Sequence, residues 1–374
     1  LRGCLLQQSR ESLLETTRLR TSRRYWQQES LADGRVAGIN RLLIDARIER
    51  EMRHRFCRTT RTSILFRSRG PNASTSPYRP PVPGECMKSA RELVDRLRAY
   101  QPPNTDLGQH FLIDDAMLER MTAIAKVDKD DHVLEIGPGP GTLTQHLLET
   151  KASVTAIEID DAPVLHLDEV FREEQNTKQL ILHHDDALHL AWPTNITKVV
   201  ANIPYQISSP LIEKLTQHLK QQPEVLQTVV LMVQHEFGQR LSMKHPADVG
   251  SLGMTVALDW DVVEHHLVAP HHFSPQPAVQ SQVIELRPHK RVFSVDKRLL
   301  RQMIHQTFEQ RRKKIRSTLR NAPKRISRIK HWHAQRWKEA VQAVQDLEIM
   351  DARPEELTLD DWIELAEKVE KGSM

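Results

Sequence analysis

A short apolar run, a turn with three glycines and an amphipathic run follow one another between residues 132 and 148. His132–Ile136 has the length and composition of a buried strand, and Thr142–Leu148 has the leucine spacing of a helix. Between them, Gly137, Gly139 and Gly141 let the backbone approach a ligand closely, and the next helix offers unpaired N–H groups at its start. This succession is typical of the opening unit of a Rossmann-like fold. We therefore expect an α/β protein with a parallel sheet.

The residues around these glycines favour S-adenosylmethionine over a dinucleotide as the ligand. A GxGxG pattern alone would also suit a nicotinamide or flavin enzyme. Here the acidic Glu135 lies inside the strand just before the turn, where it can reach the amino-acid end of S-adenosylmethionine. Pro138 and Pro140 also suit a tight turn better than a cradle for a pyrophosphate. The glycine turn is therefore interpreted as one wall of a cofactor site.

Acidic residues also follow the next two predicted strands. Glu158 follows the strand 153–157, where a carboxylate can bind both hydroxyls of a ribose, and Ile159 beside it can cover the adenine. Asp186 and Ala187 follow a strand that ends near residue 184, and this carboxylate can accept a hydrogen bond from the adenine amine. Each acid alone would equally suit a helix N-cap or a solvated strand end. Their order at successive strand ends favours a cofactor site.

The tetrapeptide at 202–205, Asn-Ile-Pro-Tyr, is suited to hold a planar amine for alkylation. An exocyclic amine such as adenine N6 is a poor nucleophile until oxygens accept its N–H bonds, and Asn202 and the Pro204 carbonyl can be those oxygens. Tyr205 offers a face on which a splayed-out base can stack. The same pattern also occurs in loops with a helix-starting proline. Its place after the cofactor motifs predicts a nucleic-acid amino-methyltransferase.

With these motifs in place, the chain resembles the KsgA-type rRNA adenine N6,N6-dimethyltransferases, a family related to the Erm methyltransferases. The resemblance extends from about Leu107 to the C-terminus and rests on ordered blocks: GQHFL at 108–112, EIGPGPG at 135–141, AIEID at 156–160, DAL at 186–188, NIPYQISSP at 202–210, LMVQHEF at 231–237, FSPQPAVQS at 273–281 and FEQRRKK at 308–314. His110, Asp185 and Ile203 differ from the residues that many relatives have there. None of these differences removes a group that methyl transfer needs.

The resemblance implies a class I methyltransferase fold and the transfer of two methyl groups from S-adenosylmethionine to each of two adjacent adenines near the 3′ end of small-subunit rRNA. It also assigns residues: Gln109, His110 and Leu112 to the cofactor, Asn202 and Tyr205 to the target base, and Phe273 to the other face of that base. The implied partners are this rRNA and the assembling small ribosomal subunit with its proteins or assembly factors. The alternative is an assembly factor, or a protein like mitochondrial transcription factor B, in which catalysis is dispensable.

Composition and charge restrict the partners. Charged residues make up 27% and hydrophobic ones 39% of the 374 residues, and no apolar run is long enough to cross a bilayer. The net charge is +4, but basic residues gather before Gly70 and between Lys290 and Lys330, which indicates an RNA bound from the flanks. The cysteines, at 4, 57 and 86, show no CxxC spacing. We therefore expect neither a metal nor a membrane partner.

Three regions are predicted along the chain. Residues 1–86 are an Arg-rich extension and linker, 87–289 a methyltransferase domain, and 290–374 a helical RNA-binding domain. The first lysine is Lys88, and a segment with Arg, Ser, Leu and Thr but no lysine resembles an organellar targeting region, although its acidic residues count against this interpretation. The mitochondrial matrix is the predicted location, and the nucleolus or cytoplasm is the alternative.

The later part of the chain is predicted to change from strands to helices. Strands are expected at 225–234, 251–258, 262–268 and 279–286, with a rigid proline loop at 273–277. Helices are expected at 296–307, 310–320, 334–345 and 359–371. A basic cluster in the second of these helices could be a solvated face, but its position after a base-modifying domain favours contact with RNA phosphates. Its members are Arg311, Arg312, Lys313, Lys314, Arg316 and Arg320.

Overall fold

The computed structural model describes residues 88–103 and 108–372, which belong to one compact unit, Val82–Met374. The Arg-rich extension with its targeting segment, and the cysteines at 4, 57 and 86, lie outside the described residues. In the part that is described, no helix has the length and apolar character needed to span a membrane. Within the same ranges, no group of three His, Cys, Asp or Glu side chains gathers as metal ligands would.

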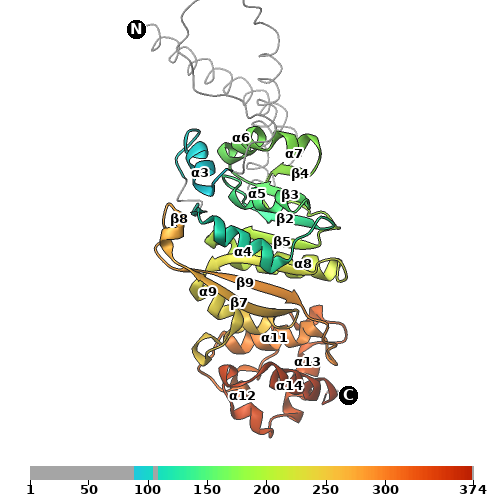
Figure 1. The fold of residues 1–374 in the computed structure, drawn as a ribbon. Coiled ribbons are helices and arrows are strands. Elements are labelled where there is room, and N and C mark those ends of the chain that lie inside the picture. The colour runs from blue at the N-terminus through green and yellow to red at the C-terminus, as the bar shows by residue number, and fades with distance from the viewer. Residues whose placement is uncertain (1–87, 104–107, 373–374) are drawn as a thin grey trace, which may run out of the picture. The chain divides into compact units, whose positions relative to one another are not determined.

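A seven-stranded sheet lies at the centre of the fold (Figure 1). Its strands are β2 His132–Ile136, β3 Ser153–Glu158, β4 Leu180–His184, β5 Lys198–Asn202, β6 Thr228–Gln234, β7 Trp260–Val268 and β9 Ser281–Pro288. Their spatial order is β4-β3-β2-β5-β6-β9-β7. The first five strands in this order are parallel to one another, and β9 is antiparallel to both of its neighbours, β6 and β7. The α/β class and the parallel sheet predicted from the glycine turn are confirmed.

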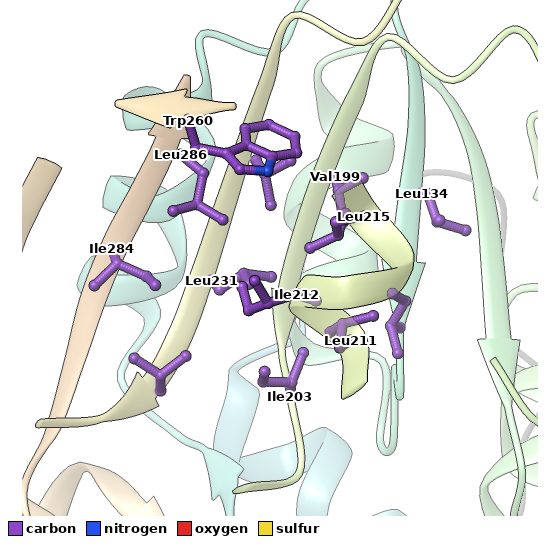
Figure 2. Close-up of a cluster of buried hydrophobic side chains, with 14 of the residues drawn as sticks. Leu134, Val199, Ile203, Leu211, Ile212, Leu215, Leu231, Trp260, Ile284 and Leu286 are labelled. Carbon is purple, nitrogen blue, oxygen red and sulfur yellow. The ribbon is translucent and has the colours of Figure 1, made fainter. Parts of the chain in front are cut away.

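Alternate side chains of the central strands enter two separate cores. Val199 and Ala201 on β5 pack in one cluster with the leucines of α8 (Ser208–Gln221), as Figure 2 shows for Val199, Leu211 and Leu215. Val200 between them packs in the other cluster, against residues of α4 (Asp115–Ala125) and α5 (Thr142–Glu149). Parallel sheets are covered by helices on both faces, so their strands appear in the sequence as continuous apolar runs.

Further helices and a second, two-stranded sheet complete this part of the chain. The helices are α3 Ala90–Arg98, α6 Asp161–Val170, α7 Arg172–Asn176, α9 His235–Ser242 and α10 Ser251–Val256. The small sheet pairs β1 (Phe111–Leu112) with β8 (Phe273–Ser274), so that Leu112 lies opposite Phe273. It joins the segment before α4 to the start of the predicted proline loop, although the two are far apart in the sequence.

The expected strand at 251–258 is wrong, because Ser251–Val256 is the helix α10. Met254 in this helix and Leu258, two residues past its end, are both buried in the core of the C-terminal helices. Gly253 lets the helix approach α9 closely, since a Cβ there would lie 2.6 Å from the carbonyl oxygen of Arg240. The other expected strands in this region correspond to β6, β7 and β9.

The C-terminal helices share a hydrophobic core of their own. They are α11 Lys297–Phe308, α12 Ile315–Thr318, α13 Ala334–Ala343 and α14 Leu359–Lys371. The predicted helix at 310–320 is only the four residues of α12, because Lys314 is its N-cap and has extended backbone angles. Met254 and Leu258 contribute to the same core, so apolar packing crosses the boundary predicted at residue 290. The separation into domains 87–289 and 290–374 remains a prediction.

Candidate active site

A cavity of about 360 Å³ lies at the carboxyl ends of the parallel strands. Its volume is within the range of small-molecule sites, and this edge of an open α/β sheet is where ligands bind. The lining residues are 108–111, 135–140, 142–143, 157–159, 185–187 and 202–207. The motifs that the sequence placed at successive strand ends thus surround a single cavity.

The glycine turn forms one wall of this cavity. Gly137, Gly139 and Gly141 have φ values of +66°, +54° and +81°, a region that side chains with a Cβ rarely adopt. A Cβ on Gly139 would lie 2.8 Å from the Phe111 ring, and one on Gly141 would lie 2.4 Å from the Phe171 ring. Gly137 and Gly139 line the cavity, as expected of cofactor contacts. Gly141 does not line it: it precedes α5 and packs against Phe171, so its cofactor contact remains a prediction.

Glu135 is a buried carboxyl at the end of β2, with 1% of its surface exposed. Its Oε2 accepts a hydrogen bond of 2.7 Å from the hydroxyl of Thr144. Burial, together with the nearby carboxylate of Glu158, raises the pKa of Glu135 to about 8. A cation beside this carboxyl would stabilise its charged form. The ammonium group at the amino-acid end of S-adenosylmethionine is such a cation.

Glu158 connects the end of β3 to the glycine turn. Its Oε1 accepts hydrogen bonds from the N–H groups of Ile159 and Asp160 at 2.9 and 3.0 Å, and its Oε2 accepts one from Gly139 at 3.0 Å. Burial raises the pKa of this carboxyl, against the opposing effect of its N–H donors. Ile159 next to it is apolar, yet it is 56% exposed and lines the cavity. The acid and its apolar neighbour thus lie where a ribose and an adenine face were predicted to bind.

Asp186 lies in the cavity lining and also makes local contacts. Its Oδ1 accepts a hydrogen bond from the Leu188 N–H at 2.7 Å, and its Oδ2 lies 2.6 Å from Nδ1 of His189. These bonds stabilise a turn at 187–189, not a helix, so the helix N-cap that formed the alternative interpretation is absent from this described segment. Ala187 is buried beside it and also lines the cavity. The local bonds of Asp186 do not exclude its predicted role at the cofactor, because they hold its carboxylate in the lining of the cavity.

The amide of Asn202 has a defined direction. Its Nδ2 donates a hydrogen bond of 3.1 Å to the backbone carbonyl of His110. Among the described residues no donor contacts Oδ1, so the oxygen is the atom left to accept from a ligand. The Pro204 carbonyl accepts from the Ile207 N–H at 3.2 Å, which leaves its second lone pair. Both oxygens therefore retain capacity to accept a hydrogen bond.

Tyr205 follows in a short 3-10 turn, Tyr205–Ile207, and is half-buried at the cavity. Its hydroxyl lies 2.6 Å from Oγ of Ser281, and its ring stacks on the imidazole of His110, with 5.8 Å between ring centroids. Burial raises the pKa of Tyr205, so the hydroxyl stays protonated as a hydrogen-bonding group. The ring is thus fixed at two places.

Leu112 and Phe273 do not reach the cavity, although the family resemblance assigns one to the cofactor and the other to the target base. They lie opposite each other in the small β1–β8 sheet, and paired residues of antiparallel strands project on the same face. That face is turned toward the core, where Leu112 is 0% and Phe273 is 1% exposed. Neither residue lines the cavity, so their contacts with the cofactor and the target base remain predictions.

Several lining residues were not predicted. Phe111 lies in the lining against Gly139, and Gln206 approaches Gly108 so closely that a Cβ there would meet its Oε1 at 2.5 Å. Thr142 and Leu143 at the start of α5 also line the cavity. In the sequence, Gly108 was the one signal for the contact with Gln206. In the structure it has a φ of +68°, a turn conformation that would strain a residue with a Cβ.

The basic cluster near α12 divides into two groups. Lys314 and Arg316 both pair with Asp351, and Arg311 lies 4.0 Å from Glu355. The remaining three are exposed and form no ion pair with another residue that the structure describes: Arg312, Lys313 and Arg320. Half of the predicted RNA-binding cations are thus partly neutralised within the chain.

The hydrogen-bond acceptors and the apolar side chain that line the cavity suit S-adenosylmethionine. Carboxylates only accept hydrogen bonds, so Glu158 matches ribose hydroxyls and Asp186 matches an exocyclic amine. Glu135, buried and without a cationic partner among the described residues, matches an ammonium group. Ile159 adds an exposed apolar side chain at the same wall. The remaining oxygens, on Asn202 and Pro204, lie on a different segment and are available to a second molecule.

Comparisons with known proteins identify the family of the chain. The family model described as Ribosomal RNA adenine dimethylase matches residues 101–347. The Ribosomal RNA small subunit methyltransferase A of Gloeobacter violaceus is 36% identical over 270 residues, which cover 70% of this chain and 92% of that protein. The protein of the same name from Prochlorococcus marinus is 33% identical over 283 residues, covering 72% of this chain and 95% of the relative.

Solved structures show the same fold. A dimethyladenosine transferase from Plasmodium falciparum superposes with a TM-score of 0.59 at 25% identity, covering 70% of this chain and 98% of that one. The 23S rRNA methyltransferase ErmE has a TM-score of 0.50 at 22% identity, covering 70% and 99% of the two chains. The predicted class I methyltransferase fold is confirmed.

Proposed function

This chain belongs to the ribosomal RNA adenine dimethylase family, and from that premise we propose that it dimethylates N6 of two adjacent adenines near the 3′ end of small-subunit rRNA. It is an S-adenosylmethionine-dependent rRNA methyltransferase. The observation that carries the proposal is the direction of the Asn202 amide, whose nitrogen is bound to the His110 carbonyl while its oxygen remains an acceptor at the cavity. An amine that must have its N–H bonds accepted is the substrate that this arrangement suits.

Residues from three strand ends would hold the cofactor. Glu158 already accepts three N–H bonds and would accept a ribose hydroxyl on Oε2, Asp186 would accept from the adenine amine, and Glu135 would face the ammonium group. Ile159 would cover one face of the adenine. When bound, S-adenosylmethionine supplies a methyl group on a positively charged sulfur, which is already a strong electrophile. The protein therefore needs no nucleophile or acid of its own, and its contribution is to align the acceptor.

The acceptor side provides alignment and dipoles. Tyr205 supplies a stacking surface for a base turned out of its helix, and Asn202 Oδ1 and the Pro204 carbonyl accept the N–H bonds of its amine. The amine nitrogen becomes positive as it attacks, so both oxygens bind it more tightly in the transition state than in the ground state. The proton of the methylated amine then leaves to water.

A finer part of the proposal concerns the partners. Arg312, Lys313 and Arg320 would bind phosphates of the rRNA, because exposed cations without an internal partner lose the least on contact with RNA. The substrate would be an assembling small ribosomal subunit, and methylation would be coupled to its maturation. The lack of lysine before Lys88 supports mitochondrial targeting of this activity. A fluorescent fusion that stays outside mitochondria would contradict the location.

Methyl transfer to defined adenines tests the proposal directly. Purified full chain would be incubated with radiolabelled S-adenosylmethionine and small ribosomal subunits that lack the 3′-terminal methyl groups. We expect label in the two adjacent adenines, located by primer extension, and labelling at least two orders of magnitude slower with the Asn202→Ala variant. A chain that acts only as an assembly factor would bind the particles and leave them unlabelled, which would refute the enzymatic proposal.

A further inference from the structure

His110 lies where three segments of the site meet. Its backbone carbonyl accepts the hydrogen bond from Asn202, and its imidazole stacks on Tyr205 with 25° between the ring planes. Its Nδ1 lies 3.0 Å from the Pro275 carbonyl oxygen, and because a carbonyl only accepts, Nδ1 carries the proton of that bond. One residue thus connects the segment before α4, the Asn-Ile-Pro-Tyr segment and the proline loop.

The Tyr205 ring is held between this imidazole and a buried hydroxyl. The 5.8 Å between the centroids of His110 and Tyr205 is within the range of favourable aromatic pairs. At the far end of the ring, the hydroxyl is fixed by Ser281, which is 0% exposed at the start of β9. The hydroxyl contact fixes one end of the ring, and the stack restrains its plane. A base would therefore meet a ring whose orientation is already set.

We propose that His110 is a positioning residue for the target adenine: it sets the plane of the Tyr205 ring and the direction of the Asn202 amide. The inference deepens the proposed function and rests on it. It assigns His110 to the acceptor side of the cavity, whereas the family resemblance assigns this position to the cofactor.

The direction of the amide decides whether Asn202 favours or opposes the reaction. With Nδ2 on the His110 carbonyl, Asn202 presents an oxygen; a rotated amide would present two N–H donors to an amine that itself donates. The carbonyl keeps its place because the His110 side chain is anchored to Pro275 and Tyr205. Acceptors fixed in advance need no reorganisation when the positive charge develops on nitrogen.

Two substitutions separate the ring of His110 from its hydrogen bond. His110→Asn keeps an N–H donor for Pro275 but removes the ring, whereas His110→Phe keeps a stacking ring but removes the donor. We expect His110→Asn to raise the KM for undermethylated small ribosomal subunits roughly 3- to 10-fold, the range of an aromatic pair, and to lower kcat as well. The His110→Phe variant should have the smaller KM defect of the two. The matched control is His266→Asn, exposed on β7 outside the cavity lining.

A double-mutant cycle with Tyr205 distinguishes positioning from a general structural role. If His110 acts through the Tyr205 ring, then His110→Asn should change KM much less in a Tyr205→Ala background than in the wild type. The Kd for S-adenosylhomocysteine should stay within about two-fold of wild type in both backgrounds, because the cofactor side is not altered. Should His110→Asn fail to fold, His110→Leu takes its place in the same cycle, with the same expected results.

The proposal is overturned by a folded His110→Asn variant with wild-type KM, by an equal effect of the substitution in both backgrounds, or by a loss of S-adenosylhomocysteine affinity that accounts for the whole defect. Failure of the proposed function would be seen separately, because the wild-type chain itself would then transfer no methyl group to the particles.

Discussion

The ring of Phe111 lies directly against Gly139, so that a Cβ on this glycine would be 2.8 Å from Cε1 of the ring. The glycine also has a φ of +54°, a conformation that is costly for any residue with a Cβ. The turn can therefore keep its shape against Phe111 only with glycine at this position.

Gly139→Ala is expected to lower the affinity for S-adenosylhomocysteine by about ten-fold or more, because the strained backbone alone costs roughly 1–2 kcal/mol. Calorimetric titration measures this effect. Gly250→Ala is the matched control, since a Cβ there meets only the Asp248 carbonyl oxygen, at 3.7 Å, and the backbone is extended. Equal affinities for the two variants would show that the close approach of Phe111 does not matter.

Replacing Asn202 tests the amide oxygen. Asn202→Ala should lower kcat by two orders of magnitude or more, in the range of a lost transition-state dipole of about 10²–10³. The cofactor Kd should change little. Asn202→Asp should not restore the rate, because a carboxylate cannot donate to the His110 carbonyl. Single-turnover methyl transfer is the measurement, and Asn176→Ala, exposed at the end of α7, is the control. Near-normal turnover by Asn202→Ala would refute the role.

Tyr205 and Ser281 should be coupled in stability. Ser281→Ala leaves the hydroxyl of the half-buried Tyr205 without its partner and is expected to cost roughly 1 kcal/mol of unfolding free energy. The double variant Ser281→Ala/Tyr205→Phe removes both polar groups, so it should recover most of that loss. Urea unfolding of the single and double variants measures the coupling. Strictly additive losses would mean that the hydroxyl contact contributes nothing.

The sequence predicted the strand-end residues of the site because their positions depend on local features. Glu135, Glu158 and Asp186 follow recognisable strands, and the carboxyl ends of parallel strands meet at one edge of a sheet. Phe111 and Leu112 could not be assigned in this way. Which of them faces the cavity is decided by pairing with β8, more than 150 residues further along the chain.

One error in secondary structure and the unforeseen division of the basic cluster have similar physical reasons. The run from Ser251 to Leu258 is apolar enough for a buried strand, but Ser251–Val256 is a helix whose Met254 packs in the core of the C-terminal helices. The division of the basic cluster was also not visible in the sequence, because Lys314 meets Asp351 across 37 positions. Contacts between distant segments decide both cases.

The pKa of Glu135 predicts a proton released on cofactor binding. At pH 7 the carboxyl of the free chain, with a pKa of about 8, is mostly protonated. An ammonium group beside it would favour the carboxylate and lower that pKa, so binding should release up to one proton and strengthen as pH rises toward 8. Titration of S-adenosylhomocysteine in buffers of different ionisation enthalpy counts the protons. Buffer-independent heats, or equal release by Glu135→Gln, would contradict the prediction.

The same carboxyl should make the chain less stable as pH rises. Its folded pKa of about 8 lies above the ordinary value of 4.5, so between these values the folded state holds one proton more than the unfolded state. Unfolding free energy should therefore fall with pH in this window, by at most roughly 1.4 kcal/mol per pH unit from this group. Glu135→Gln should flatten the slope in urea unfolding. If Glu135→Gln kept the wild-type slope, the pH dependence of the unfolding free energy would come from other groups.

The ion pairs of the basic cluster predict unequal effects of removing its members. Arg312, Lys313 and Arg320 have no internal partner among the described residues, so replacing all three with Gln should weaken RNA binding and reduce the slope of log K against log salt by about two to three. Neutralising Lys314 and Arg316 should have a smaller effect, because Asp351 already offsets their charge. Filter binding to small-subunit RNA at several salt concentrations measures both slopes. If both variants reduce the salt slope equally, the ion pairs of Lys314 and Arg316 with Asp351 break when RNA binds. The division of the cluster into paired and unpaired cations would then not affect RNA binding.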